Sequence, residues 1–109
     1  MNASTHEVRA TRTATPVLVQ AVEPVPGLFV YEQPDELRRP SQISPWRIGH
    51  HSGLVIANAM YEGDAIRGAQ KIADLADWTL PADGLRRDVS PTELYDALSW
   101  ASCDHPAYA

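Results

Sequence analysis

The chain is organised around one continuous segment, WRIGHHSGLVIANAMYEGDAIRGAQKIADLADW, which spans residues 46–78. Two strand-like runs flank Ser52-Gly53, and glycine adopts without steric cost the positive φ that a tight hairpin turn requires. After the second run, apolar residues recur at steps of three and four, which is the period of an amphipathic helix. The segment therefore predicts a β-hairpin that leads directly into a helix over residues 64–77.

A two-residue loop at Ser52-Gly53 would set the register of this hairpin and divide its side chains between two faces. The first face carries the apolar residues together with one histidine: Trp46, Ile48, His50, Val55, Ala57 and Ala59. The second face carries a mixed set: Arg47, His51, Leu54, Ile56, Asn58 and Met60. Such a mixture is unusual for a fully solvated surface, so we expect the second strand to be central or this face to be half covered.

Composition limits the class of protein. A chain of 109 residues with 44% hydrophobic residues is typical of a single globular domain. Its one cysteine excludes an internal disulfide and a CxxC zinc site. No apolar run approaches the roughly 20 residues that span a bilayer, and there is no signal-peptide pattern, so we expect a cytoplasmic protein without membrane contact. The net charge of -5 disfavours non-specific nucleic-acid binding, which depends on neutralising phosphates.

The flanking segments predict further elements. Residues 16–23 and 28–33 are rich in β-branched and aromatic residues and lie on either side of a Pro/Gly turn, which indicates a first hairpin. Residues 34–45 contain three prolines and are expected to be a connector. Residues 79–88 are expected to be a loop. In the helix that follows, Ser90 is expected to be the N-cap and the first residue of a capping box.

These elements follow the order β-β-β-β-α-α. Strands followed by helices predict an α+β fold, with an antiparallel sheet of about four strands covered on one face by two helices. We expect the domain to span residues 16–103. Residues 1–15 lack apolar periodicity and are expected to form a flexible tail, as are residues 104–109.

The second face of the hairpin yields the main functional hypothesis. If its apolar residues are exposed, they form the kind of patch that marks a partner or dimer interface. The expected function is a non-enzymatic interaction or regulatory module that binds another protein or a second copy of itself. The candidate contact residues are Arg47, His51, Leu54, Ile56 and Met60.

Two alternative functions depend on other residues. Nucleic-acid binding would use a basic set, with a tryptophan stacking on a base: Arg38, Arg39, Arg47, Arg86 and Arg87. A small hydrolase or metal-dependent enzyme would use His50 or His51 together with Cys103 and His105. Adjacent strand residues point to opposite faces, so His50 and His51 cannot easily share a metal. We therefore assign no catalytic residue, metal ligand or cofactor.

Two short motifs carry a resemblance. HHSGLVIA at residues 50–57, followed by a short helix and IADLADWT at residues 72–79, resembles small uncharacterised proteins of actinobacterial phages and mobile elements. The resemblance covers about half of the chain and brings no known active site with it. It implies a small accessory or regulatory protein.

Overall fold

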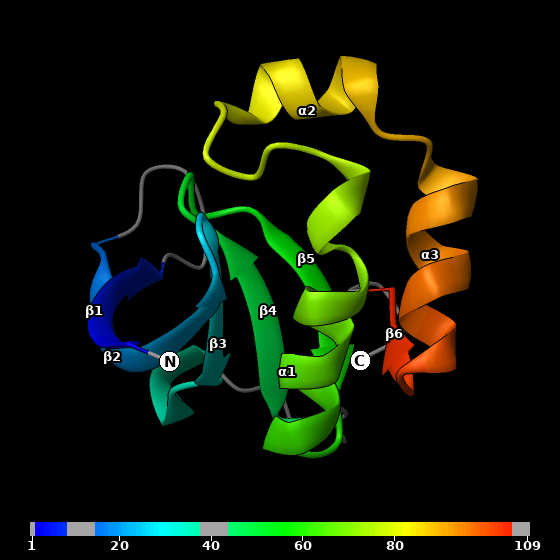
Figure 1. Cartoon of the computed structure of the whole chain (residues 1–109). Helices are drawn as coiled ribbons and strands as arrows, with labels where there is room; N and C mark the ends of the chain where they lie inside the picture. Colours follow the sequence, from blue (N-terminus) through cyan, green and yellow to red (C-terminus); the bar gives the residue numbers. More distant parts are fainter. Residues whose placement is uncertain (1, 9–14, 38–43, 106–109) are drawn as a thin grey trace.

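The fold is α+β, as predicted, and Figure 1 shows its arrangement in a computed structural model that describes residues 2–8, 15–37 and 44–105. Within these residues, six antiparallel strands form one sheet in sequence order: β1 (Asn2–Val8), β2 (Val17–Val25), β3 (Leu28–Glu32), β4 (Trp46–His50), β5 (Val55–Ala59) and β6 (Cys103–Asp104). The α-helices are α1 (Glu62–Lys71), α2 (Ala82–Asp88) and α3 (Pro91–Trp100). Two 3-10 turns, η1 (Asp35–Leu37) and η2 (Ala73–Leu75), complete the described elements.

The expectation of about four strands omitted the two edge strands. The flexible tail predicted for residues 1–15 is wrong for residues 2–8, which form β1 and pair with β2. The flexible end predicted for residues 104–109 is wrong at Asp104, which pairs with Asn58 as part of β6. Residues 9–14 and 106–109 lie outside the described residues. Both edge strands depend on pairing with a neighbouring strand, which local composition does not reveal.

The register of the β4–β5 hairpin is confirmed away from the turn and wrong beside it. Ile48 faces Ala57 as predicted, but Gly49 faces Val55, so β5 has one extra residue at this point. The His50 N–H donates to the Leu54 carbonyl at 2.8 Å, which leaves a three-residue loop over residues 51–53. Such a bulge changes which face the side chains point to. Ile56 consequently belongs to the core and not to the second face.

Helix α1 packs across the sheet on alanine. Ala65 and Ala69 are fully buried against strands β2 to β5. Gly68 explains how closely the helix approaches: a Cβ on this residue would lie 2.6 Å from Cys103 Sγ and 3.0 Å from Ile48 Cδ1. The helix ends at Lys71, and η2 replaces the last turn of the helix predicted over residues 64–77. The absence of a side chain at residue 68 therefore allows the helix and the sheet to pack this closely.

The second face of the sheet is partly covered by strands of the same sheet. Val8, Ala21 and Tyr31 form a separate buried cluster on this face. The imidazole of His6 stacks on Phe29 with ring centroids 4.6 Å apart, and its Nε2 lies 3.2 Å from the position that a Cβ on Gly49 would take. A side chain from edge strand β1 thus reaches central strand β4. The N-terminal strands therefore curl over this face, which makes it half covered.

Two helices follow α1, where the sequence predicted one. The loop expected over residues 79–88 is wrong for residues 82–88, which form α2. Among the α2 residues whose burial is described, Leu85 is the one buried side chain. This helix therefore lacks the repeated apolar positions by which an amphipathic helix is recognised in a sequence. The next helix, α3, begins as predicted, with the Glu93 N–H donating to Ser90 Oγ at 3.5 Å and Pro91 in the first turn. Figure 1 shows α2 at one end of the molecule, joined to α3 by a short connection.

Candidate functional site

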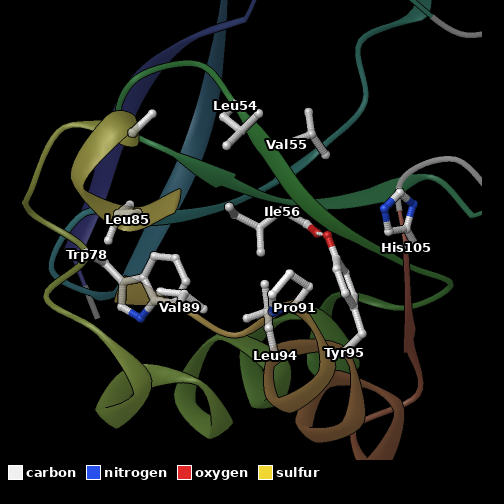
Figure 2. A pocket seen from close by; sticks show the side chains of 11 residues that line it. Leu54, Val55, Ile56, Trp78, Leu85, Val89, Pro91, Leu94, Tyr95 and His105 are labelled. Carbon is white, nitrogen blue, oxygen red and sulfur yellow. Dashed lines mark hydrogen bonds between the residues drawn. The ribbon is translucent and has the colours of Figure 1, made fainter. Parts of the chain in front are cut away.

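An apolar groove lies between β5, α2 and α3. It has a volume of about 360 Å³, which falls within the range of small-molecule sites. Figure 2 shows the side chains of Ile56 and Leu94 pointing toward one another across it. The residues that line the groove are Leu54, Val55, Ile56, Trp78, Ala82, Leu85, Val89, Pro91, Leu94, Tyr95 and His105. The lining is almost entirely apolar, so the groove favours an apolar occupant.

One wall of the groove is a strand edge. Strand β6 pairs with β5 only at Asn58 and Ala59. Toward the turn, the described residues place a single group on the outer edge of β5: the Tyr95 hydroxyl donates to the Ile56 carbonyl at 3.3 Å (Figure 2). The remaining outward backbone groups between Val55 and Ala57 have no bond to any described residue. An unpaired strand edge of this kind is a template for another strand.

The polar end of the groove contains Tyr95 and His105. Their ring centroids lie 4.7 Å apart, with the planes tilted by 48°. Burial raises the pKa of Tyr95 above its ordinary value, so the phenol stays protonated and can donate its hydrogen bond to Ile56. Among the described residues that line the groove, these two are the only titratable ones. The groove therefore has neither the carboxylate nor the thiol that nucleophilic chemistry commonly uses.

A cluster of four residues at the hairpin tip holds one side of the groove in place. Its members are Gly27, His50, His51 and Trp78. We call it the hairpin-tip anchor. His50 Nε2–H donates to the Trp78 carbonyl at 2.9 Å, and His50 Nδ1 accepts from the Ser52 N–H at 3.2 Å. His51 Nε2–H is shared between the carbonyls of the next two residues, 79 and 80, at 3.0 Å each. Both histidines therefore fasten the turn to the segment that leads into α2.

Gly27 and Trp78 complete this anchor. Gly27 has a φ of 89°, and a Cβ there would lie 2.1 Å from the Trp78 carbonyl oxygen. Its own carbonyl accepts from the His51 N–H at 3.0 Å. The Trp78 indole Nε1–H donates to the Ile72 carbonyl at 2.8 Å, and the ring lines the groove. Trp78 thus belongs to both the anchor and the groove, so the position of one depends on that of the other.

The residues predicted to contact a partner separate into two groups. Leu54 and Met60 are 40% and 42% exposed, and His51 is also exposed. Ile56 is only 5% exposed because the bulge turns it into the core, and this corrects the expectation that it lies on an exposed patch. Arg47 is 3% exposed beneath the curled strands and donates to the carbonyls of Ser44 and Trp46. Among the five candidates, only Leu54 and Ile56 line the groove.

The basic set predicted for nucleic acid is not brought together in the described residues. Arg47 is buried and cannot reach a phosphate, whereas Arg87 is exposed on α2. Arg38 and Arg39 lie outside the described residues, and so does the side chain of Arg86. The described part of the chain therefore supplies one exposed arginine from this set.

The histidine and cysteine candidates also lie apart. Cys103 is buried under α1, its Sγ–H donates to the Asp64 carbonyl at 3.3 Å, and burial with nearby carboxylates raises its pKa to about 11. His105 lies against Tyr95, away from the hairpin-tip anchor that holds His50 and His51. Across the described ranges, no group of three or more His, Cys, Asp or Glu residues could hold a metal ion. The pair expected for a small hydrolase, Cys103 with His50 or His51, is not assembled.

Most of the groove was missed by sequence reasoning. Leu85 and Val89 line the groove because residues 82–88 form α2, whereas the sequence predicted a loop there. Tyr95 carries no motif that would mark it as a groove residue in the sequence. A usable signal was present in the helix-start pattern SPTE at residues 90–93, because it positions the residues immediately after it.

Comparisons with protein-family models, with curated proteins and with solved structures found no match to the chain. The resemblance to actinobacterial phage proteins therefore stays a prediction. No helix within the described residues is long and apolar enough to cross a membrane.

Proposed function

We propose that the domain is a non-enzymatic protein-interaction module that binds a segment of another protein in the apolar groove. The observation that carries this proposal is an apolar groove beside an unpaired strand edge, both on the same side of β5. Burying apolar surface is the main favourable contribution to most protein association. A regulatory role in a phage or mobile-element setting, in the cytoplasm, is part of the same proposal and rests on the sequence resemblance alone.

The chemistry of the groove supports binding over catalysis. The backbone carbonyl of Ile56 holds the Tyr95 hydroxyl, and no carboxylate or thiol lines the groove to accept or transfer a proton. Nucleophilic catalysis needs a base within hydrogen-bond reach of a nucleophile and a third group that orients the base. The described lining residues supply an apolar surface with one donor at one end, which is the composition of a binding site.

A tagged pull-down with a matched pair of variants tests the proposal. Leu54→Asp places a charge in the groove at a side chain that is 40% exposed, so the domain should stay folded. Leu18→Asp makes the same change at a side chain that is 65% exposed on β2 and does not line the groove. We expect nuclease-treated actinobacterial lysate to yield a protein that wild type and Leu18→Asp retain and Leu54→Asp loses.

Two outcomes would contradict this function. If every retained protein binds Leu54→Asp as well as wild type, the groove is not the binding surface. If retention disappears when nuclease is added, the bound species is nucleic acid and the basic residues become the relevant set. Size-exclusion chromatography of the same variants adds a further comparison, because a dimer that Leu54→Asp converts to a monomer would identify a second copy as the occupant.

A further inference from the structure

We infer that the segment bound in the groove is extended and adds to the outer edge of β5 as a further antiparallel or parallel strand, with apolar side chains in the groove and basic residues on either side. This inference rests on the proposed function and specifies the class of partner. It follows from the strand edge, the hydrogen bond of Tyr95, the groove walls and the charges around the rim.

The strand edge supplies the first argument. Strand β6 occupies the outer side of β5 only opposite Asn58 and Ala59, so a segment opposite residues 54–57 would lie in line with β6. The Leu54 carbonyl is bonded inward to the His50 N–H. The bulge at Ile56 interrupts the alternation of backbone directions, and the Ile56 carbonyl lies on the outer edge of β5, where the Tyr95 hydroxyl reaches it and where an incoming backbone could bond. Free backbone donors and acceptors favour a peptide over a purely apolar small molecule.

Tyr95 supplies the second argument. Its hydroxyl donates to the Ile56 carbonyl at 3.3 Å, where the N–H of an added strand would otherwise donate. The phenol therefore satisfies the edge of β5 in the free domain and competes with a peptide for one acceptor. A side-chain donor can leave by rotating about its own bonds, and no strand has to separate.

The groove walls supply the third argument. A strand added to β5 lies about 4.8 Å from it and points every second side chain to the same face. On that face, α2 and α3 present Leu85, Val89 and Leu94 opposite the Ile56 side chain (Figure 2). Alternate residues of the bound segment would thus enter an apolar space, and the residues between them would point away from it. A pattern of apolar and polar residues in alternation is expected.

Charge supplies the fourth argument. Five exposed carboxylates are each the sequence neighbour of a residue that lines the groove: Asp83, Asp88, Glu93, Asp96 and Asp104. Among the exposed side chains described in α2, α3 and β6, Arg87 is the one base. The net charge of the whole chain is also negative, at -5. Lysine or arginine residues that flank the apolar positions would therefore be attracted to the rim, with a strength that salt reduces.

The test uses a phage-displayed library of random seven-residue peptides flanked by lysine at each end, selected on the wild-type domain and counter-selected on Leu54→Asp. Synthetic versions of the enriched peptides are then scanned by N-methylation, one backbone nitrogen at a time. We expect alternate sensitivity: methylation at every second residue weakens binding by roughly tenfold or more, and methylation at the residues between has little effect. A helical or irregular peptide would not give this period of two.

A Tyr95→Phe variant gives an independent readout. It removes the competing hydroxyl and keeps the ring, so the enriched peptides should bind roughly three- to tenfold more tightly. The affinity of the uncharged hydrocarbon dye pyrene should stay unchanged, because pyrene has no hydrogen-bond donor for the freed carbonyl. Leu18→Asp is the control and should bind both probes as wild type does.

The results separate the two levels of the proposal. Peptides that depend on Leu54 but show no alternation in the N-methyl scan would overturn strand addition and leave the groove as the binding surface. A library with no Leu54-dependent peptide, or a groove that binds only the dye, would overturn the peptide proposal. A dimer that persists with the peptides present and is lost in Leu54→Asp would identify a second copy as the occupant and would overturn it too.

Discussion

The hairpin-tip anchor and the groove lie on either side of the same turn, and they differ in how completely their backbone groups are hydrogen-bonded. In the anchor, the carbonyls of residues 27, 78, 79 and 80 each accept a bond, and a glycine allows the two backbones to meet. In the groove, the outer edge of β5 keeps one side-chain bond, from Tyr95 to Ile56. The hydrogen bonds to these carbonyls fix the first region, and the incomplete bonding of the β5 edge is what the proposed partner would use in the second.

Trp78 connects the two regions and shows why they belong together. Its carbonyl is held by His50 and its ring forms part of the groove. The anchor therefore fixes the side of the groove from which α2 departs. The comparison predicts that substitutions in the anchor change stability and that substitutions at exposed groove residues change binding.

The largest effect on stability is expected where the groove meets the core. Ile56→Asp would bury a carboxylate at a side chain that is 5% exposed, and we expect it to lower the free energy of unfolding by about 4 kcal/mol or more. Leu54→Asp, two residues away at the rim, should change it by less than about 0.5 kcal/mol. Urea denaturation followed by circular dichroism measures both. Equal losses for the two variants would place Leu54 in the core and remove the boundary between groove and core.

A smaller but still large effect is expected in the anchor. Gly27→Ala adds a Cβ that would lie 2.1 Å from the Trp78 carbonyl oxygen, at a φ of 89°. Strain and overpacking together should cost about 3 kcal/mol or more.

Gly53→Ala is the matched control for this change. Gly53 also has a positive φ, of 96°, but a Cβ there would meet nothing within 4 Å. Only the conformational cost of about 1 to 2 kcal/mol remains. If the two variants lose the same stability in urea, close approach at Trp78 contributes nothing and the anchor is looser than its geometry indicates.

The two adjacent histidines give the next comparison. His50 is fully buried and bonds to Trp78 and Ser52, so His50→Ala leaves a cavity and unsatisfied partners, at an expected cost of about 2 to 3 kcal/mol. His51 is exposed and water can replace it at the carbonyls of residues 79 and 80, so His51→Ala should cost less than about 1 kcal/mol. Thermal and urea unfolding of both variants measure this difference. A larger loss for His51→Ala would contradict the assignment of His50 as the central residue.

The sequence predicted those parts of the molecule whose cause is local. Ser90 begins α3 because its side chain bonds to a backbone N–H three residues later, and that relation can be read in four letters. The hairpin of β4 and β5 was predicted because its turn and its strands are contiguous. The same local logic placed Ile48 opposite Ala57, which the structure confirms.

What the sequence did not predict depends on contacts between distant residues. Strand β1 contains Ser, Thr and Glu and becomes a strand by pairing with β2, and β6 has only two residues. The loop has three residues, one more than the Ser-Gly turn signal indicated, and the bulge at Ile56 restores the predicted register from the Ile48–Ala57 pair onward. The groove needs α2, and Leu85 is the one buried side chain among those described in this helix. The sequence therefore contained the residues of the groove walls but gave no sign that they form one surface.

The smallest effect is expected from protonation of His6 and His50, which belong to the curled strands and to the anchor. Burial lowers the pKa of His6 and of His50 below the ordinary value of 6.5, and neighbouring imidazoles lower both further. The unfolded chain therefore binds these protons more readily than the folded domain does. Stability is full above about pH 6.5 and declines as the pH falls below that value toward the lowered pKa of each folded imidazole.

Urea denaturation at a series of pH values between about 8 and 5 measures this decline. His50→Gln removes one of the two titrating groups, so its free energy of unfolding should fall less steeply with decreasing pH than that of wild type. Neither His6 nor His50 lines the groove, so the His50→Gln variant should bind the peptides as wild type does at any one pH at which both are folded. A variant whose pH dependence has the same slope as wild type would show that His50 is not neutral in the anchor, and that a protonated ring can hold the hairpin tip to Trp78.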